Sequence, residues 1–224
     1  MRLLSHRSPN FGTRRGGVRP DLVVIHYTAM TSCDAARDRL CDPAAEVSAH
    51  YLIAEDGTVL ALVPEEARAW HAGAGAWGGV SDVNSRSIGI ELANDGAQPF
   101  AAPQMVVLEA LLAGVMARWR IPPERVIAHS DMAPGRKGDP GRRFDWRRLA
   151  LGGFSVWPEG AGSGIGFAAA ARAFGYPDVA EDLVLAAFRL RFRPGASGPP
   201  DAEDARMAEA LALRFPVDAA GAGA

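Results

Sequence analysis

The stretch LVVIHY, residues 22–27, is a nearly continuous apolar run that ends in a histidine and a tyrosine. Runs of this kind are typical of strands that are buried on both faces of a sheet. The run therefore predicts a central strand with His26 at its end. In α/β sheets, functional sites assemble at the strand ends and in the loops that follow them.

Shorter strand signals lie further along the chain. Residues 50–54 and 58–63 flank an Asp-Gly dipeptide, which favours a hairpin turn. SIGIEL, residues 87–92, alternates in character, which places Glu91 mid-strand on the face opposite to its isoleucines. RVIAH is another short strand, and it ends at His129.

Helical patterns are interleaved with these strands. Residues 32–41 favour a short helix that begins near Ser32, and residues 104–119 carry the apolar spacing of an amphipathic helix. Asp145 is placed to cap a short helix that begins at Trp146. Strands alternating with helices predict an α/β fold with a mixed central sheet flanked by helices.

The remaining segments divide the chain. Residues 1–20 are polar and favour a leading arm, whereas residues 70–86 favour a long functional loop. The expected organisation is a catalytic domain, a Gly-rich linker, a small all-α domain of three helices and a disordered alanine-rich tail. These parts span residues 1–152, 153–165, 166–218 and 219–224, respectively.

Composition excludes several classes of protein. Hydrophobic residues make up 48% of the chain, and 24 Lys and Arg against 26 Asp and Glu give a net charge of −2. This balance argues against nucleic acid and anionic membranes as partners. No apolar run has the length of a membrane span or a signal peptide, so we expect a cytoplasmic protein, or a periplasmic one if a signal was removed. Cys33 and Cys41 favour two buried thiols without a disulfide.

Two of the five histidines stand where a metal ion could be bound. His26 and His129 each end a predicted strand, and Asp139 follows in a Pro/Gly-rich loop. Two histidines and a carboxylate suit a catalytic zinc ion and leave a fourth position open. Spacing alone is a weak signal, because a histidine at a strand end is more often a structural residue.

Two further residues could take part in catalysis. Glu91 is either a general base or the partner of an arginine, because an unpaired buried charge is costly. Lys137 is either a solvated loop lysine or a cation that stabilises a developing oxyanion. The long loop contains Trp70, His71, Trp77 and Asn84. Its aromatic and polar groups suit a sugar–peptide ligand, although tryptophans also pin loops in place.

Five ordered blocks together resemble the type-2 N-acetylmuramoyl-L-alanine amidases, relatives of peptidoglycan recognition proteins. The blocks are VVIHYTA (23–29), VSAHYLIAEDG (47–57), RAWHAG (68–73), SIGIELAN (87–94) and AHSDMAPGRKGDPGRRFDW (128–146). The last block, with its K-x-D-P-G, is the most specific. The resemblance implies hydrolysis of the amide between N-acetylmuramic acid and L-alanine in peptidoglycan or muropeptides.

The resemblance also implies roles for individual residues. His26, His129 and Asp139 resemble the ligands of one zinc ion per chain, Glu91 the carboxylate that activates water, and Lys137 the cation that supports the tetrahedral intermediate. The blocks imply a substrate-binding set of His71, Trp70, Asn84 and His50. Within this set, His50 is expected to be a supporting residue near the hairpin.

Within the family, the chain is most similar to bacterial recycling and outer-membrane-anchored amidases, which accept anhydro-muropeptides. The final 50 or so residues resemble the helical peptidoglycan-binding domain that some of them carry, with AFRLRFRP (187–194) as the matching piece. A monomer or weak dimer is expected. The rival hypotheses are a non-catalytic muropeptide-binding protein, a zinc hydrolase acting on another amide, and a C-terminal bundle that mediates dimerisation.

Overall fold

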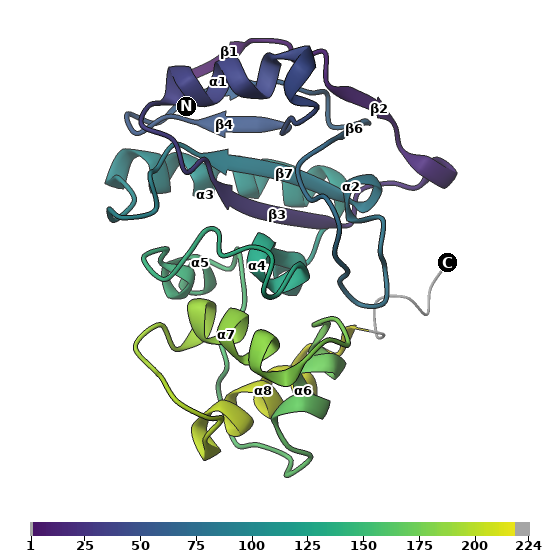
Figure 1. Cartoon of the computed structure of the whole chain (residues 1–224), viewed down its shortest axis with the longest axis vertical. Helices are drawn as coiled ribbons and strands as arrows, with labels where there is room; N and C mark the ends of the chain where they lie inside the picture. The colour runs from purple at the N-terminus through teal and green to yellow at the C-terminus, as the bar shows by residue number, and fades with distance from the viewer. Residues whose placement is uncertain (1, 218–224) are drawn as a thin grey trace.

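A six-stranded mixed sheet in the order β1-β5-β4-β7-β3-β8 forms the centre of the computed structural model, which describes residues 2–217 (Figure 1). Its strands are β1 (Arg2–Ser5), β3 (Leu22–Tyr27), β4 (Tyr51–Ile53), β5 (Thr58–Ala61), β7 (Ser87–Leu92) and β8 (Val126–Ala128). Neighbours from β4 to β8 are parallel, whereas β5 is antiparallel to β4 and parallel to β1. The predicted mixed α/β class and the β4–β5 hairpin are confirmed.

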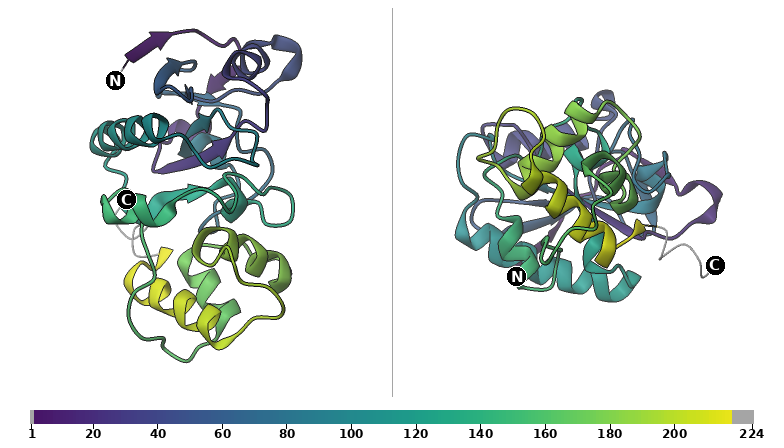
Figure 2. Two further views of the ribbon diagram at one scale, coloured as in Figure 1. Left: turned by 90° about the vertical axis from the view of Figure 1, so that its left-hand side faces the viewer. Right: turned by 90° about the horizontal axis from the view of Figure 1, so that it is seen from below.

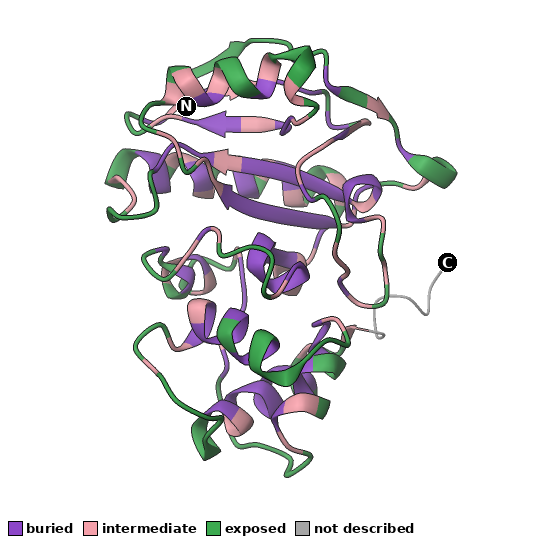
Figure 3. Cartoon of the chain, viewed as in Figure 1, coloured by how far each residue is buried: buried purple, intermediate pink, exposed green. Residues whose placement is uncertain are grey.

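Strand β3 separates two apolar cores, because its side chains alternate between the faces of the sheet. Leu22 and Val24 belong to a core that extends into the C-terminal helices, and Val23 and Ile25 to the core beneath α3. Figure 3 shows β3 buried along most of its length. The predicted central strand is confirmed, and its alternation puts His26 on the face of Val24.

Helices lie between the strands and after the last of them: α1 (Cys33–Cys41), α2 (Val83–Arg86), α3 (Ala102–Trp119), α4 (His129–Met132) and α5 (Trp146–Leu151), with 3-10 turns η1 (Arg15–Gly17), η2 (Pro43–Ala45) and η3 (Pro123–Arg125). Ser32 caps α1 by accepting a hydrogen bond of 3.1 Å from the amide of Ala35. Asp145 caps α5 in the same way, with 2.9 Å to the amide of Arg148. The three predicted helices in this part of the chain are confirmed.

The C-terminal residues form α6 (Phe167–Phe174), α7 (Glu181–Phe192) and α8 (Ala202–Arg214), which confirms the three predicted helices. They lie at the end of the molecule beyond β8 and far from α1 (Figure 2). Their buried side chains, such as Phe188 and Leu211, share one core with Val24, Ile127 and Met132. The helical part is therefore packed continuously onto the sheet. The tail at 219–224 lies outside the described residues.

The prediction of a leading arm at residues 1–20 is wrong. β1 forms one edge of the main sheet, and β2 (Phe11–Thr13) pairs with β6 (Ala67–Ala69) in a second, two-stranded sheet. All four residues of β1 are exposed, so its side chains carry no alternating pattern that could reveal a strand. Its place depends on backbone pairing with β5, which leaves no signal in the sequence.

Two local predictions also need correction. Cys33 and Cys41 are free, as expected, but both are partly exposed, because α1 lies on the surface and buries only Ala36 and Leu40. His129 does not end a strand: β8 stops at Ala128, and His129 is the first residue of α4. None of the helices within residues 2–217 is long and apolar enough to span a membrane.

The long loop at 70–86 is largely irregular, as predicted, but it is anchored. Trp77 is 3% exposed and packs edge-on against Phe174 and Tyr176, with ring centroids 5.5 and 5.2 Å apart. The loop ends in the short helix α2. This tryptophan therefore pins the loop to the C-terminal helices, which was one of the two alternatives for tryptophans in this segment.

Candidate metal centre and cavity

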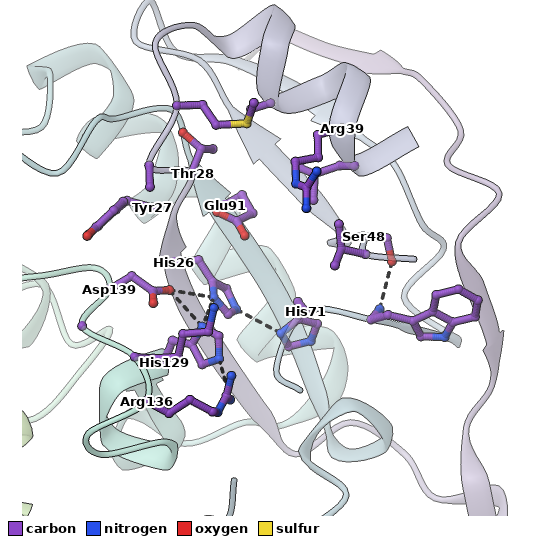
Figure 4. Close-up of a pocket in the computed structure, with 18 residues that line it drawn as sticks. His26, Tyr27, Thr28, Arg39, Ser48, His71, Glu91, His129, Arg136 and Asp139 are labelled. Atoms are coloured by element: carbon purple, nitrogen blue, oxygen red, sulfur yellow. Dashed lines mark hydrogen bonds and ion pairs between the residues drawn. The ribbon is translucent and has the colours of Figure 1, made fainter. Parts of the chain in front are cut away.

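Three potential ligand atoms meet at the carboxyl ends of β3 and β8 (Figure 4). Nδ1 of His26 lies 2.9 Å from Nδ1 of His129, and each lies 3.0 Å from Oδ2 of Asp139. The side chains of His26, His129 and Asp139 are only 1%, 4% and 12% exposed. Such a buried group of two nitrogens and one oxygen can hold a metal ion.

The protonation states of this group suit metal binding. Burial, followed by the neighbouring His129, lowers the pKa of His26 to about 4. Burial alone would raise the pKa of Asp139, but the close approach of His129 and His26 keeps it below its ordinary value. Neutral imidazole and ionised carboxylate are the forms that coordinate metals. At neutral pH a metal ion could therefore bind to His26 and Asp139 without displacing a proton from either residue.

The second ring nitrogen of His129 is held by the backbone. Nε2 lies 2.8 Å from the carbonyl oxygen of Ala72, to which it donates its N–H. This assignment leaves the lone pair on Nδ1, the atom that faces Asp139. Arg136 donates to the same carbonyl at 2.6 Å. Ala72 lies in the anchored loop, so the loop fixes the orientation of this imidazole.

A chain of hydrogen bonds orients His26. Ser87 Oγ donates to the carbonyl of Val83 at 2.6 Å, so it accepts from His71 Nε2 at 3.1 Å. His71 Nδ1 then accepts from His26 Nε2 at 3.0 Å, which leaves the lone pair of His26 on Nδ1. Burial, followed by His26, lowers the pKa of His71 well below its usual value, so His71 stays neutral as this chain requires.

The place of His71 depends on a glycine in β7. A Cβ atom at Gly89 would lie 2.4 Å from the His71 ring, so any larger residue would displace the imidazole. The His71 ring therefore requires a glycine at position 89, and the alternation of SIGIEL does not reveal this requirement. His71 lines the cavity, as expected of a substrate-binding residue, but its hydrogen bond to His26 also makes it a support for the metal centre.

Glu91 stands next to this centre without a charged partner. It is in register with His26 on the adjacent strand, so both side chains project from one face of the sheet. Its Oε2 is buried and makes no hydrogen bond with any described residue. Burial, followed by the charge of Asp139, raises the pKa of Glu91 to about 8, while Lys137 opposes the rise. The alternative of an arginine salt bridge is therefore wrong for residues 2–217.

These groups open into one cavity of about 400 Å³. Besides the metal group, its wall includes Glu91, Lys137, Trp70 and His71. Lys137 is exposed on the loop that carries Asp139. The cavity thus combines a candidate metal group, a carboxylate that can exchange a proton and a free ammonium group.

Two arginines in the cavity wall were missed by sequence reasoning. Arg39 reaches the cavity from α1, and Arg136 comes from the loop that also holds Lys137 (Figure 4). The position of Arg136 next to Lys137 could have indicated it. Nothing in the sequence, however, indicates that α1 lies over the metal group. The two arginines make the cavity suitable for an anionic ligand.

His50 and Asn84 do not line the cavity. His50 is fully buried, accepts a hydrogen bond of 2.9 Å from the amide of Gly89 on Nδ1, and donates from Nε2 to Ala67 at 3.2 Å. Asn84 is 7% exposed, and its Oδ1 accepts from the amides of His71 and Ala72 at 3.1 and 2.8 Å. Both residues support the strands and loop that orient the imidazoles. Their predicted contact with substrate gains no support from these positions.

A metal group beside a proton-exchanging carboxylate, in a cavity open to solvent, is the arrangement of a metal-dependent hydrolase. Sequence comparison agrees and is more specific. A family described as N-acetylmuramoyl-L-alanine amidase matches residues 16–142, and the chain belongs to this family of enzymes. The resemblance inferred from the five sequence blocks is thereby confirmed.

Known relatives are similar to this chain in sequence, and a solved relative has the same fold. The N-acetylmuramoyl-L-alanine amidase AmiD of Escherichia coli K12 is 37% identical over 89% of this chain and 85% of its own length. The 1,6-anhydro-N-acetylmuramyl-L-alanine amidase AmpD of Enterobacter cloacae is 34% identical, over 63% of this chain and 85% of its own length. AmpDh3 from Pseudomonas aeruginosa, solved in complex with anhydromuramic pentapeptide, is 31% identical and superposes with a TM-score of 0.79 over 91% of this chain and 95% of its own.

Proposed function

We propose that this amidase is a zinc enzyme that releases the stem peptide from 1,6-anhydro-muropeptides. The observation that carries the proposal is the pairing of Glu91 with His26 across β7 and β3, which puts a carboxylate beside the metal group in one cavity. The similarity to AmpD and to AmpDh3, which was solved with an anhydromuramic peptide, supports the choice of substrate.

The donor set fits zinc. Two imidazole nitrogens and one carboxylate oxygen are typical of catalytic zinc sites, which keep one position open. Ligand atoms at ~2.0–2.1 Å from a tetrahedral ion lie ~3.3 Å from one another. The separations of 2.9–3.0 Å between His26, His129 and Asp139 need only small adjustments to match. A bound zinc ion would supply Lewis-acid chemistry, by polarising the carbonyl and lowering the pKa of water.

Glu91 would transfer the proton. In its ionised form it takes a proton from the water that attacks the lactyl carbonyl, and it then gives that proton to the nitrogen of L-alanine as the C–N bond breaks. Its raised pKa in the protein without metal, about 8, favours retention of the proton between these two events. A cation held by His26 and Asp139 favours the ionised form that begins the cycle.

Lys137 would stabilise the charge that develops on the carbonyl oxygen. It lies two residues before Asp139, on the cavity wall, and makes no ion pair with another described residue. A free ammonium group near a reacting carbonyl lowers the energy of the tetrahedral state more than that of the uncharged substrate. This difference is what makes the interaction catalytic and not merely a binding contact.

The stem peptide would lie along the cationic part of the cavity. Its D-glutamate is joined through the side chain in the ligand of the AmiD complex, anhydro-N-acetylmuramic acid-L-Ala-D-gamma-Glu-L-Lys, so one carboxylate stays free. Arg39 and Arg136 offer guanidinium groups that suit such a carboxylate. The charge pattern thus favours an anionic peptide over a neutral amide.

The test is digestion of purified anhydro-N-acetylmuramyl tripeptide, followed by mass spectrometry of the products. The expected result is free tripeptide, formed by the wild type, stopped by a chelator and restored by zinc. Glu91→Gln is the matched control, because it keeps the shape of the side chain but cannot accept the proton. Cleavage of another bond, or cleavage by the chelated enzyme, would overturn the proposal. Binding without cleavage would support the rival muropeptide-binding protein.

A further inference from the structure

We propose that Arg191 and Tyr176, from the C-terminal helical part, are positioning residues for the metal ligand His129. They act through Asp131, which lies two residues after that ligand. The inference rests on the proposed metal-binding role of His129, and it gives the helical part a role in building the active site. The contacts that carry it connect α7 and the segment just after α6 with the β8–α4 junction.

The segment that carries His129 has little support of its own. α4 contains only four residues, and His129 is the first of them. A single helical turn is not stable alone. Asp131 fixes the turn between strand and helix, because its Oδ2 accepts a hydrogen bond of 2.9 Å from the amide of Ala128. The direction of the His129 side chain therefore depends on the place of the Asp131 carboxylate.

The C-terminal helices hold that carboxylate. Asp131 is 0% exposed, so its charge must be balanced inside the protein. Arg191 of α7 donates to Oδ2 at 2.5 Å, and the Tyr176 hydroxyl donates to Oδ1 at 2.7 Å. In Figure 1, α7 lies directly beneath α4. Both oxygens of Asp131 are thus bound by residues from beyond position 170.

Arg191 also binds the strand that leads to His129. It donates to the carbonyl of Val126 in β8 at 3.1 Å and to Ser155 Oγ at 3.0 Å. Its guanidinium lies 4.3 Å from the centre of the Trp146 ring, which restricts its position further. The buried side chain of Arg191 therefore binds both the strand that precedes His129 and the helix that begins at His129.

A second buried ion pair on α7 provides a control. Arg189 donates to Asp204 of α8 at 3.1 Å and to the carbonyls of Gly198 and Pro199 at 2.7 and 2.9 Å. Its side chain is 8% exposed and that of Asp204 is 0% exposed, so the pair is almost as buried as Arg191 and Asp131. All of its partners lie within the helical part, however, and none of them touches the metal group.

The test compares Arg191→Met, Tyr176→Phe and the control Arg189→Met in the full chain. Zinc affinity is measured by competition with a chromophoric chelator, thermal unfolding with and without zinc, and kcat and KM on the anhydro-muropeptide. We expect Arg191→Met and Tyr176→Phe to weaken zinc binding by ~10- to 100-fold, the range for supporting residues of metal ligands. They should also lower kcat more than KM. Arg189→Met should lower the unfolding temperature of the metal-free protein but leave zinc affinity unchanged.

Tyr176→Phe keeps the ring in the core and removes only the hydroxyl, so it carries the test if Arg191→Met fails to fold. Normal zinc affinity in Tyr176→Phe, or an equal loss in Arg189→Met, would overturn the inference and leave the proposed function intact. Failure of the wild type to bind zinc would overturn both. Partial recovery of zinc affinity in Arg191→Lys, compared with Arg191→Met, would support a role for the charge in placing Asp131.

Discussion

The carboxylates at the two ends of the central strands have opposite surroundings. Before β3, Asp21 binds Arg86 and Arg125, so the carboxylate is matched by two cations. At the other end, Glu91 has a buried oxygen without a partner beside a crowded group of potential ligands. The first end is built for stability, and the second tolerates an unfavourable charge that catalysis can use. Substitutions at each end of the strands test this contrast.

Glu91→Gln should have the largest effect. Loss of a general base lowers turnover by ~10²–10⁴-fold. Zinc content and unfolding temperature should not fall, because the substitution keeps the shape of the side chain and Oε2 of Glu91 makes no hydrogen bond within the described residues that could be lost. Turnover is measured by release of stem peptide, and zinc by elemental analysis of the purified protein. A variant that loses zinc together with activity would show that Glu91 belongs to the metal group and not to the proton-transfer step.

Gly89→Ala should weaken zinc binding by ~10-fold or more, as expected for loss of a group that orients a ligand. The new methyl group would collide with the His71 ring, which orients His26. Gly12→Ala is the matched control, because a Cβ at Gly12 meets no atom within 4 Å. Zinc affinity is measured by chelator competition. Unchanged affinity in Gly89→Ala would mean that the hydrogen bond from His26 to His71 does not orient the ligand.

The stability of the metal-free protein should depend on pH through Glu91. Its pKa rises from an ordinary 4.5 to about 8 on folding, mainly because of burial. Between these values the folded state binds more protons than the unfolded chain, so the free energy of unfolding falls as pH rises through this range.

Glu91→Gln should lack this loss, so its advantage in stability over the wild type should grow with pH. Urea unfolding of both proteins in the presence of a chelator measures the difference. His26 titrates in both proteins, so comparing them isolates the contribution of Glu91. A difference that stays constant with pH would contradict the raised pKa.

Asp21→Asn should have the smallest effect, and it should lower the stability of the protein instead of its turnover or zinc binding. It weakens the ion pairs with Arg86 and Arg125, whose side chains are 31% and 14% exposed. Solvent screening of partly exposed pairs limits the loss to about 1 kcal/mol of unfolding free energy. Turnover and zinc affinity should match the wild type. A fall in zinc affinity would show that the two ends of the strands are coupled, and it would contradict the separation of a stabilising end from a catalytic end.

The sequence predicted the parts of the site that depend on strand periodicity. The apolar run of β3 places His26 at the end of a strand, and the alternation of β7 places Glu91 on the face opposite to its isoleucines. That both side chains project from the same face follows from the register between the two strands, which the local pattern does not record. The support of His26 by His71 depends on how a loop packs against Gly89, and the approach of Arg39 depends on where α1 crosses the sheet. Such contacts join residues distant in sequence, so no local pattern records them. The exposed strand β1 escaped prediction for the same reason.

The pair of Asp131 and Arg191 joins residues 60 positions apart, and this separation has a consequence for the order of assembly. Contacts of long sequence separation form late, because the intervening chain must first be ordered. During synthesis, the strands and all three proposed ligands leave the ribosome before α7 does. The contacts of Arg191 with the β8–α4 junction form only when α7 packs against it. Full zinc affinity would therefore be reached only at a late step of folding.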